Sequence, residues 1–507
     1  MRSKKSIYNV VASLTYKIGT CVIGLLVPRL FVMSYGSELN GLQSSISQIF
    51  AYIALIEAGV GEATLQSLFG PIAKKEYKKA NEILSATTFY YNKIGFIYFG
   101  LLVVLALFYP IFIKVDSISY ITVVAYILFS GATTGINFFY QAKILLVIQA
   151  TGDIYINSLV TMIMYLLTSF VKIGCILAGI NIVMIQVGYF IINTIMMAVY
   201  YLIAKKKYKW IDFKEKPDYS AISQKNSVLI HKISGTIFQN VDVIILTVLC
   251  GLEVVSIYTM YKLVINMITT IITSFSDSFN YIFGQTFNSK SREEYCRVID
   301  TFNVFYSAIA FALFTVTNIM LLPFLKLYTN GMDINYILPV LPYLYIVIEV
   351  LQVGREAMIR TITVAGQFSK TLYSTIIETT INLTVSIVAV LICKHLWGDV
   401  AGLYGALMGT IAALLFRTFD INTYANRKIL GRSSWKTNKI MIINVCVFLS
   451  VTYIVNMLKI QISTYTEFVF WGVPVTILVV SIYMIVQMLL NPKETKNMHM
   501  LFRNIRK

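Results

Sequence analysis

Long hydrophobic stretches separated by short polar segments run along the whole 507-residue sequence. A helix needs about 20 apolar residues to cross the hydrocarbon core of a bilayer, and about fourteen stretches reach that length. They lie at residues 7–34, 41–68, 84–113, 120–142, 154–177, 182–204, 227–249, 254–283, 302–325, 337–360, 372–393, 401–421, 440–458 and 468–490. The pattern predicts an all-α integral membrane protein with about 14 transmembrane helices.

The distribution of basic residues supports this assignment independently. Cytoplasmic loops of membrane proteins are rich in Lys and Arg, and here alternate connections carry most of them. The basic segments are 2–5, 74–79, 205–216, 290–297, 427–439 and 493–507. This alternation predicts an even number of spans with both termini in the cytoplasm. The net charge of +18 is therefore mainly a topology signal, and nucleic acid is not an expected partner.

The composition and the short connections limit the kinds of chemistry that the chain can perform. Only 13% of its residues are charged, against roughly 25% in soluble domains. The longest connection, 205–225, reads as an interfacial linker rather than a domain. The six cysteines have no metal-binding spacing, and nucleotide-loop and zinc-protease motifs are absent. We therefore predict no catalytic residue, no metal and no cofactor, and place any binding site inside the membrane.

Two halves of the sequence resemble each other at an offset of about 215 to 218 residues. Gly36-Ser37-Glu38 corresponds to Gly251-Leu252-Glu253, and Glu76-Tyr77 to Glu294-Tyr295. Six spans separate the two starts, so both halves enter the membrane in the same direction and form a parallel repeat. Transporters use such repeats as two lobes around a substrate site, with alternating access.

This repeat gives the predicted domain organisation. An N-lobe of six helices covers residues 1–204, a cytoplasmic linker covers 205–225, and a C-lobe of helices seven to twelve covers 226–425. Residues 426–507 add two helices and a cytoplasmic tail.

Short motifs in both halves carry a family resemblance. They are Pro28-Arg29-Leu30, the segment Gly36-Ser37-Glu38-Leu39-Asn40-Gly41-Leu42, the segment from Tyr52 to Gly61, Asn240-Val241-Asp242, Gly251 and Ser256-Ile257-Tyr258. With these motifs the chain resembles the polysaccharide-repeat-unit flippases, of O-antigen or capsule type, in the multidrug, oligosaccharidyl-lipid and polysaccharide (MOP) exporter superfamily. Members of that family often carry Gly at the position of Ser256.

The resemblance implies a function in the bacterial cytoplasmic membrane. Flippases of this kind move undecaprenyl-diphosphate-linked oligosaccharide repeat units from the cytoplasmic to the outer leaflet for polysaccharide biosynthesis. The expected partners are the lipid-linked oligosaccharide, membrane lipids, a polysaccharide polymerase and glycosyltransferases.

Cations inside the predicted spans are the candidate substrate-binding residues, because charges within a membrane usually face an interior or a cavity. They are Lys17, Arg29, Lys93, Lys172, Lys262 and Arg355. In a low-dielectric cleft such cations attract phosphate oxygens strongly. For Arg29, near a span end, the alternative is that the side chain reaches to lipid headgroups.

Acidic residues inside the spans have two possible roles, ion coupling or pairing with a cation. The candidates are Asp242, Glu57, Glu356 and Glu378, with Arg360 as a pairing partner. Glu356 and Arg360 are four residues apart, which places them on one helix face and favours an ion pair over contact with substrate.

Two other functions remain open at this point. An ion-coupled drug or cation antiporter of the same architecture would use buried acids to attract its ligands. A membrane scaffold for glycosyltransferases would transport nothing. The sequence leaves the glycan, the coupling ion and the oligomeric state undetermined.

Overall fold

A computed structural model describes residues 2–57, 60–139, 141–213, 215–219, 225–457 and 462–505. These residues form helices joined by turns and loops, and they contain no strand. Ten helices in this part of the chain are long and apolar enough to cross a membrane. The predicted all-α, multi-pass membrane architecture is confirmed.

The chain divides into two compact units, Met1–Ser256 and Ile257–Lys507, which we call the N-unit and the C-unit. The N-unit contains α1 (Arg2–Ile53), η1 (Ala54–Glu57), α2 (Val60–Lys74), α3 (Tyr77–Phe112), α4 (Tyr120–Phe139), α5 (Gln141–Ala150), α6 (Ile154–Leu177), α7 (Ile182–Lys207), α8 (Lys225–Leu249) and the first residues of α9 (Leu252–Asp277).

The C-unit contains the rest of α9 and all the helices that follow it. These are α10 (Asn280–Ser289), α11 (Arg292–Tyr328), α12 (Leu341–Val364), η3 (Phe368–Thr371), α13 (Leu372–Trp397), η4 (Asp399–Ala401), α14 (Gly402–Tyr424), η5 (Ala425–Ile429), α15 (Trp435–Met457), α16 (Tyr465–Leu490) and α17 (Pro492–Ile505).

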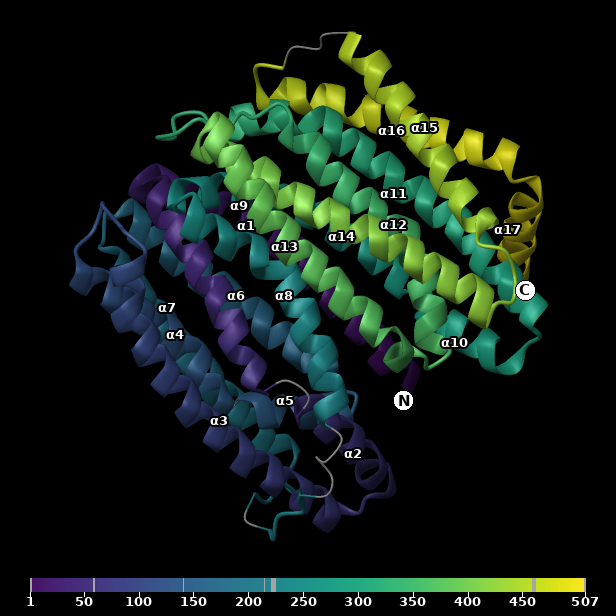
Figure 1. Cartoon of the computed structure of the whole chain (residues 1–507). Helices are drawn as coiled ribbons and strands as arrows, with labels where there is room; N and C mark the ends of the chain where they lie inside the picture. The colour runs from purple at the N-terminus through teal and green to yellow at the C-terminus, as the bar shows by residue number, and fades with distance from the viewer. Residues whose placement is uncertain are drawn as a thin grey trace. The chain divides into compact units, whose positions relative to one another are not determined.

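Neighbouring helices of the N-unit pack in a continuous series. Helix α3 lies along α4, α4 along α7, α7 along α6, and α6 along α1 (Figure 1). Large side chains such as Tyr98, Tyr126 and Leu42 fill the spaces between them and are almost fully buried. This packing fixes which face of each helix points into the unit.

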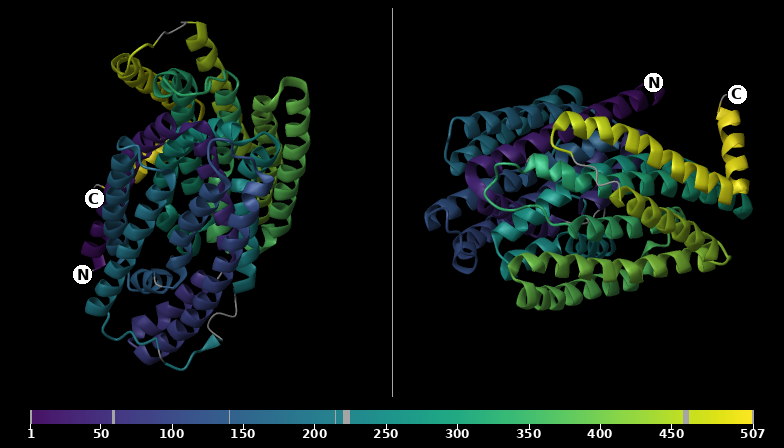
Figure 2. Two further views of the ribbon diagram at one scale, coloured as in Figure 1. Left: turned by 90° about the vertical axis from the view of Figure 1, so that its left-hand side faces the viewer. Right: turned by 90° about the horizontal axis from the view of Figure 1, so that it is seen from above.

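The C-unit is held together by close packing of α13 on α14 and by the central helix α11. Gly405 and Gly409 of α14 lie so close to the backbone of α13 that a Cβ atom at either position would overlap it. Small residues four apart are a common way to bring membrane helices together. Helix α11 packs on α12, α15 and α16. Helices α15, α16 and α17, at the end of the chain, are the yellow-green and yellow elements of Figure 2.

The order of elements repeats, as the sequence predicts. In the first half, the part of α1 after Gly36 is followed by a break, the short α2 and the long α3. In the second half, α9 is followed by a break, the short α10 and the long α11, at an offset of about 215 residues. Gly36 and Gly251 begin these series, and both adopt positive φ, 84° and 94°. Glycine tolerates this conformation, which is strained for other residues.

The two motif segments of the repeat meet inside the N-unit. Asn40 Nδ2 donates a hydrogen bond to Ser256 Oγ over 2.8 Å. Gly41 packs directly on the backbone of Leu252, leaving no room for a side chain. Ser256 thus serves as a buried hydrogen-bond acceptor.

Several element boundaries differ from those predicted. The predicted spans 41–68 and 254–283 are each divided, the first by η1 and the second by the break between α9 and α10. Residues 76–82, expected in a loop, mostly belong to α3, and Lys143, also expected in a loop, lies on α5. The segment after residue 490, expected to be a tail, contains the helix α17. Helix α11 begins ten residues before the predicted span because Ser291 and Glu294 form a capping box there.

Candidate functional site

A cavity of about 410 Å³ lies within the N-unit. Its lining comes from four α-helices and η1, and the positions on α1 and α4 recur every three or four residues, as one helix face requires. The lining residues are Gln43, Ile46, Ser47, Phe50 and Ala51 from α1, Ala54 from η1, Tyr126, Ser130 and Thr134 from α4, Lys172 from α6, and Gln186 and Tyr189 from α7. We call it the Lys172 cavity.

Lys172 is the charged residue of this lining. Its side chain is only 5% exposed, and its Nζ donates a hydrogen bond to Gln43 Oε1 over 3.1 Å. The Nζ also lies 4.7 Å from the centre of the Phe31 ring, a cation–π distance. No described carboxylate forms an ion pair with it. Burying a charge without a counter-ion is costly, so this lysine is a candidate for function rather than for stability.

The rest of the polar lining is neutral. Tyr126 is almost fully buried and contacts both Ser130 and Gln186, while Ser47 and Gln43 add a hydroxyl and an amide from α1. Hydroxyl and amide groups both donate and accept hydrogen bonds. One cation surrounded by such groups, with no acid among the described lining residues, can bind an anion or a polar neutral group.

The C-unit contains a different arrangement of buried charge. Arg355 Nη1 lies 2.8 Å from Glu378 Oε1, and Arg417 Nε lies 3.3 Å from Glu378 Oε2. Arg417 also contacts Asp420 at 2.7 Å and donates to Thr375 Oγ1 over 2.9 Å. Arg355, Glu378 and Arg417 are at most 11% exposed. We call these two cations and two acids the C-unit charge cluster.

Glu356 and Arg360 form the intrahelical ion pair that their spacing favours, at 2.6 Å. Arg360 Nη2 also contacts Asp277 at 2.8 Å, and its Nη1 donates to Asn280 over 2.8 Å. Ser276 donates to Glu356 over 2.9 Å. These bonds connect α12 to α9 and α10, so the pair has a clear structural role inside the C-unit.

Two of the predicted acids lie in the N-unit near α1. Asp242 on α8 is 4% exposed and interacts electrostatically with Tyr52 of α1. Glu57, half-buried in η1, forms a hydrogen bond with the Tyr91 side chain of α3.

Three of the remaining predicted cations, Arg29, Lys93 and Lys262, lie outside the Lys172 cavity lining. Lys93 is exposed on α3 and Arg29 is half-buried on α1. Lys262 is half-buried on α9, with its Nζ 5.3 Å from the centre of the Tyr258 ring. The side chain of Lys17 is outside the described part of the structure. Substrate binding by these four residues stays a prediction.

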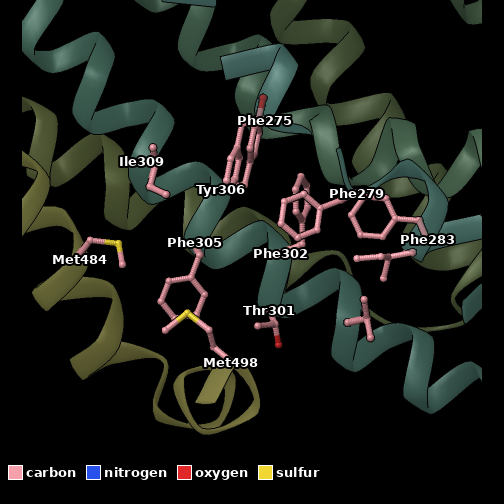
Figure 3. A pocket seen from close by; sticks show the side chains of 12 residues that line it. Phe275, Phe279, Phe283, Thr301, Phe302, Phe305, Tyr306, Ile309, Met484 and Met498 are labelled. Carbon is pink, nitrogen blue, oxygen red and sulfur yellow. The ribbon is translucent and has the colours of Figure 1, made fainter. Parts of the chain in front are cut away.

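An apolar cavity of about 490 Å³ lies within the C-unit and was not anticipated from the sequence. Figure 3 shows its labelled side chains converging from several helices. The Phe302 and Tyr306 rings stack at 4.9 Å, and Phe275 stacks on Tyr306 at 6.5 Å. The lining is Phe275, Phe279, Ile282, Phe283, Val298, Thr301, Phe302, Phe305, Tyr306, Ile309, Met484 and Met498.

Sequence reasoning missed the neutral residues of the Lys172 cavity because only charged positions were considered. A signal was nevertheless present. Gln43 and Ser47 are four residues apart, and Tyr126, Ser130 and Thr134 recur every four residues within otherwise apolar stretches. Polar positions with helical spacing inside a span indicate a polar face.

Comparison with known proteins identifies the fold. No protein-family model matches the sequence, and no curated protein sequence matches it significantly. Solved structures do match. The lipid II flippase MurJ, in an inward closed conformation, has a TM-score of 0.65 at 13% identity, covering 96% of this chain and 98% of its own.

Two other transporter structures match a smaller share of the chain. An inward-facing multidrug resistance MATE family transporter of the MOP superfamily has a TM-score of 0.63 at 16% identity, covering 82% of this chain and 98% of its own. A MOP superfamily transporter from Pyrococcus furiosus, described with a binding pocket of reverse polarity, has a TM-score of 0.58 at 16% identity, covering 84% and 96%. The chain therefore shares its fold with these three solved structures.

Proposed function

We propose that this protein is a membrane transporter that flips an undecaprenyl-diphosphate-linked oligosaccharide from the cytoplasmic to the outer leaflet by alternating access of two lobes. The observation that carries the proposal is Lys172, a buried cation that lines a polar cavity and pairs with no described carboxylate. The lobes correspond to residues 1–204 and 226–425, and both termini face the cytoplasm.

The chemistry of the Lys172 cavity supports an anionic ligand. An ammonium group in a low-dielectric site attracts phosphate oxygens more strongly than it would in water. Gln43, Ser47 and Gln186 can hydrogen-bond further oxygens of a phosphate or a sugar, and Tyr189 offers a ring for sugar stacking. The hydrogen bond from Lys172 Nζ to Gln43 Oε1 gives the ammonium group a polar partner while no ligand is bound.

The extent of the fold match also supports a lipid-linked substrate. The MurJ alignment spans 96% of the chain, against 82% for the MATE transporter. The chain thus has a larger share in common with a structure described as a lipid II flippase.

An ion-coupled drug or cation antiporter is the second candidate function. The described lining of the Lys172 cavity contains one cation and no acid, which disfavours cationic drugs by electrostatic repulsion. The Pyrococcus furiosus transporter is a precedent for a pocket of reverse polarity in this fold. A non-transporting scaffold is disfavoured because it has no use for an unpaired buried cation.

We assign ion coupling to Glu57 and Asp242 rather than to Glu378. Both carboxylate oxygens of Glu378 contact an arginine, which leaves them occupied as structural partners. Collapse of the proton and sodium gradients should slow flipping if Glu57 or Asp242 couples to either ion, and an unchanged rate would show that transport is uncoupled.

The test is a flipping assay in proteoliposomes with a fluorescent undecaprenyl-diphosphate-linked oligosaccharide in one arm and a cationic dye in the other. The expected result is flipping of the oligosaccharide well above that in protein-free vesicles and no dye transport. Dye transport without flipping would establish the antiporter instead, and neither activity would favour the scaffold. In the same assay, Lys206→Gln is the control for Lys172→Gln, because it removes one positive charge at the exposed end of α7.

A further inference from the structure

A second cavity of the C-unit is rich in positive charge. It has a volume of about 660 Å³ and is lined by the start of α11, the segment before α15, the start of α15 and helix α17. Six of its lining residues are cations and three are acids. The lining is Arg292, Glu293, Cys296, Arg297, Asp300, Leu430, Arg432, Lys436, Lys493, Glu494, Lys496 and Asn497. We call it the basic cavity.

The two buried acids of the basic cavity already have partners. Arg432 contacts Asp300 at 2.6 Å, and Lys436 contacts Asp300 at 2.8 Å and Glu494 at 2.7 Å. Asp300 and Glu494 are 7% and 8% exposed. These ion pairs connect α17 to α11 and α15. In this part of the cavity lining, the two carboxylates compensate the charges of Arg432 and Lys436.

The remaining cations are the ones available to a ligand. Arg292 donates to the carbonyl of Ile429 over 2.5 Å, whereas Arg297, Lys493 and Lys496 are exposed and have no ion-pair partner among the described carboxylates. Glu293 is the one acid of the lining outside the Asp300 and Glu494 ion pairs. Three exposed cations around one cavity form a site for a phosphate group, which lysine and arginine bind by charge and hydrogen bonding.

The position of the basic cavity indicates where that phosphate comes from. On α11, Arg297 and Asp300 line the basic cavity while the adjacent Val298 and Thr301 line the apolar cavity. On α17, Lys496 lines the first cavity and Met498 the second, and Met498 packs against the cluster that contains Phe305 (Figure 3). A charged site and an apolar site on the same two helices match the headgroup and chain of one lipid.

We propose that the basic and apolar cavities of the C-unit together bind one anionic phospholipid of the surrounding bilayer. Its phosphate contacts Arg297, Lys493 and Lys496, and one acyl chain enters between the aromatic side chains of α9 and α11. Basic pockets at the cytoplasmic ends of membrane helices bind anionic headgroups in this way. The bound lipid holds α17 against α11 and α16, so the C-unit becomes more stable in anionic membranes. The proposal is independent of what the Lys172 cavity transports.

The test measures lipid binding to the purified full chain by native mass spectrometry, with thermal unfolding in parallel. The probes are phosphatidylglycerol and phosphatidylcholine with identical long chains. We expect at least tenfold tighter binding of phosphatidylglycerol, and a higher Tm with it. The triple variant Arg297→Gln, Lys493→Gln, Lys496→Gln should lose about 10- to 100-fold of this affinity, since each basic residue near an anionic lipid contributes about 1 kcal/mol.

The matched control removes the same charge elsewhere. Lys74→Gln, Lys78→Gln, Lys79→Gln changes three exposed residues near the junction of α2 and α3 and should leave the affinity within about twofold. Equal binding of both lipids, or equal losses in both triple variants, would overturn the site.

Two further arms test the identity of the occupant. Filling the apolar cavity with Ile309→Trp should weaken binding of long-chain phosphatidylglycerol but not of its dihexanoyl analogue. Equal binding of the two lipids to the unmodified protein would show a headgroup site without a chain site and contradict the proposal. Preferential binding of an undecaprenyl diphosphate over phosphatidylglycerol, lost in the triple variant, would also contradict it and assign the cavities to the transported substrate.

Discussion

Helices α6 and α13 occupy corresponding places in the repeat, about 218 residues apart, yet they carry buried charge in opposite ways. On α6, Lys172 lines a cavity and has a glutamine as its hydrogen-bond partner. On α13, Glu378 lies between Arg355 and Arg417, and the residue that the offset matches to Lys172 is the buried Val390. The same helix of one fold thus holds a candidate binding site in one unit and a cross-link in the other.

The difference shows how to separate functional from structural charge in this fold. A charge with matched partners stabilises the packing around it, and its removal leaves those partners uncompensated. A charge without a partner destabilises its surroundings until a ligand binds. The predictions below test this distinction, beginning with the largest expected effect.

Glu378→Gln should destabilise the C-unit by about 3–5 kcal/mol, because it leaves two buried arginines with one fewer counter-ion. Thermal unfolding of the purified protein measures the loss. The double variant Glu378→Gln, Arg355→Gln restores charge balance and should recover part of it. A Tm unchanged in the single variant would mean that the cluster does not stabilise the C-unit.

Lys172→Gln should lower flipping of the lipid-linked oligosaccharide by about tenfold or more, since a charge-assisted hydrogen bond to a charged ligand contributes about 1.5–3 kcal/mol. Its Tm should not fall, because the substitution removes an unpaired buried charge. Flipping rate and thermal unfolding are measured on the same preparation. A lower Tm with normal flipping would reverse the roles that we assign to α6 and α13.

Gln43→Glu tests whether the Lys172 cavity can be converted into a cross-link. A carboxylate at this position lies within reach of the Lys172 Nζ, since Gln43 Oε1 is 3.1 Å from it. We expect an ion pair that raises the Tm and slows flipping about tenfold, because the cation is no longer free for the substrate. Because Glu and Gln have nearly the same shape, comparison with the wild type isolates the effect of the charge. Faster flipping in the variant would contradict the account.

Asp420→Asn should have the smallest effect, about 1 kcal/mol or less, because Asp420 is 27% exposed and is an outer partner of Arg417. Arg417 keeps Glu378 and Thr375 as partners. Thermal unfolding should place this variant between wild type and Glu378→Gln. A loss as large as that of Glu378→Gln would indicate that the cluster depends on its total charge rather than on its central carboxylate.

Much of the fold could be predicted because it depends on local sequence properties. Span length, loop charge and the repeat offset predict the helices and their order, and the predicted 154–177 coincides with α6. The breaks at η1 and after Asp277 were not predicted, because Glu57 and the polar segment Ser276-Asp277-Ser278 were each counted inside a span long enough to cross the membrane. The early start of α11 required recognising the capping box of Ser291 and Glu294.

For the candidate site, the sequence could predict the kind of residue, a cation inside a span, but not which of these cations lines a cavity. Lys93 and Lys172 are both lysines deep in apolar spans, yet the first is exposed on α3 and the second is buried on α6. The difference arises from the rotation of each helix within the packed unit, which depends on tertiary contacts. The apolar cavity escaped prediction for the same reason, because its aromatic residues look like ordinary packing residues in the sequence.

The central claim is that Lys172 binds the anionic part of a lipid-linked substrate, and equilibrium binding tests it most directly. The dissociation constant of an undecaprenyl-diphosphate-linked oligosaccharide is compared between wild type, Lys172→Gln and the control Lys206→Gln, at fixed salt. The account predicts at least tenfold weaker binding to Lys172→Gln and no change in the control. Equal affinity in all three proteins would contradict it.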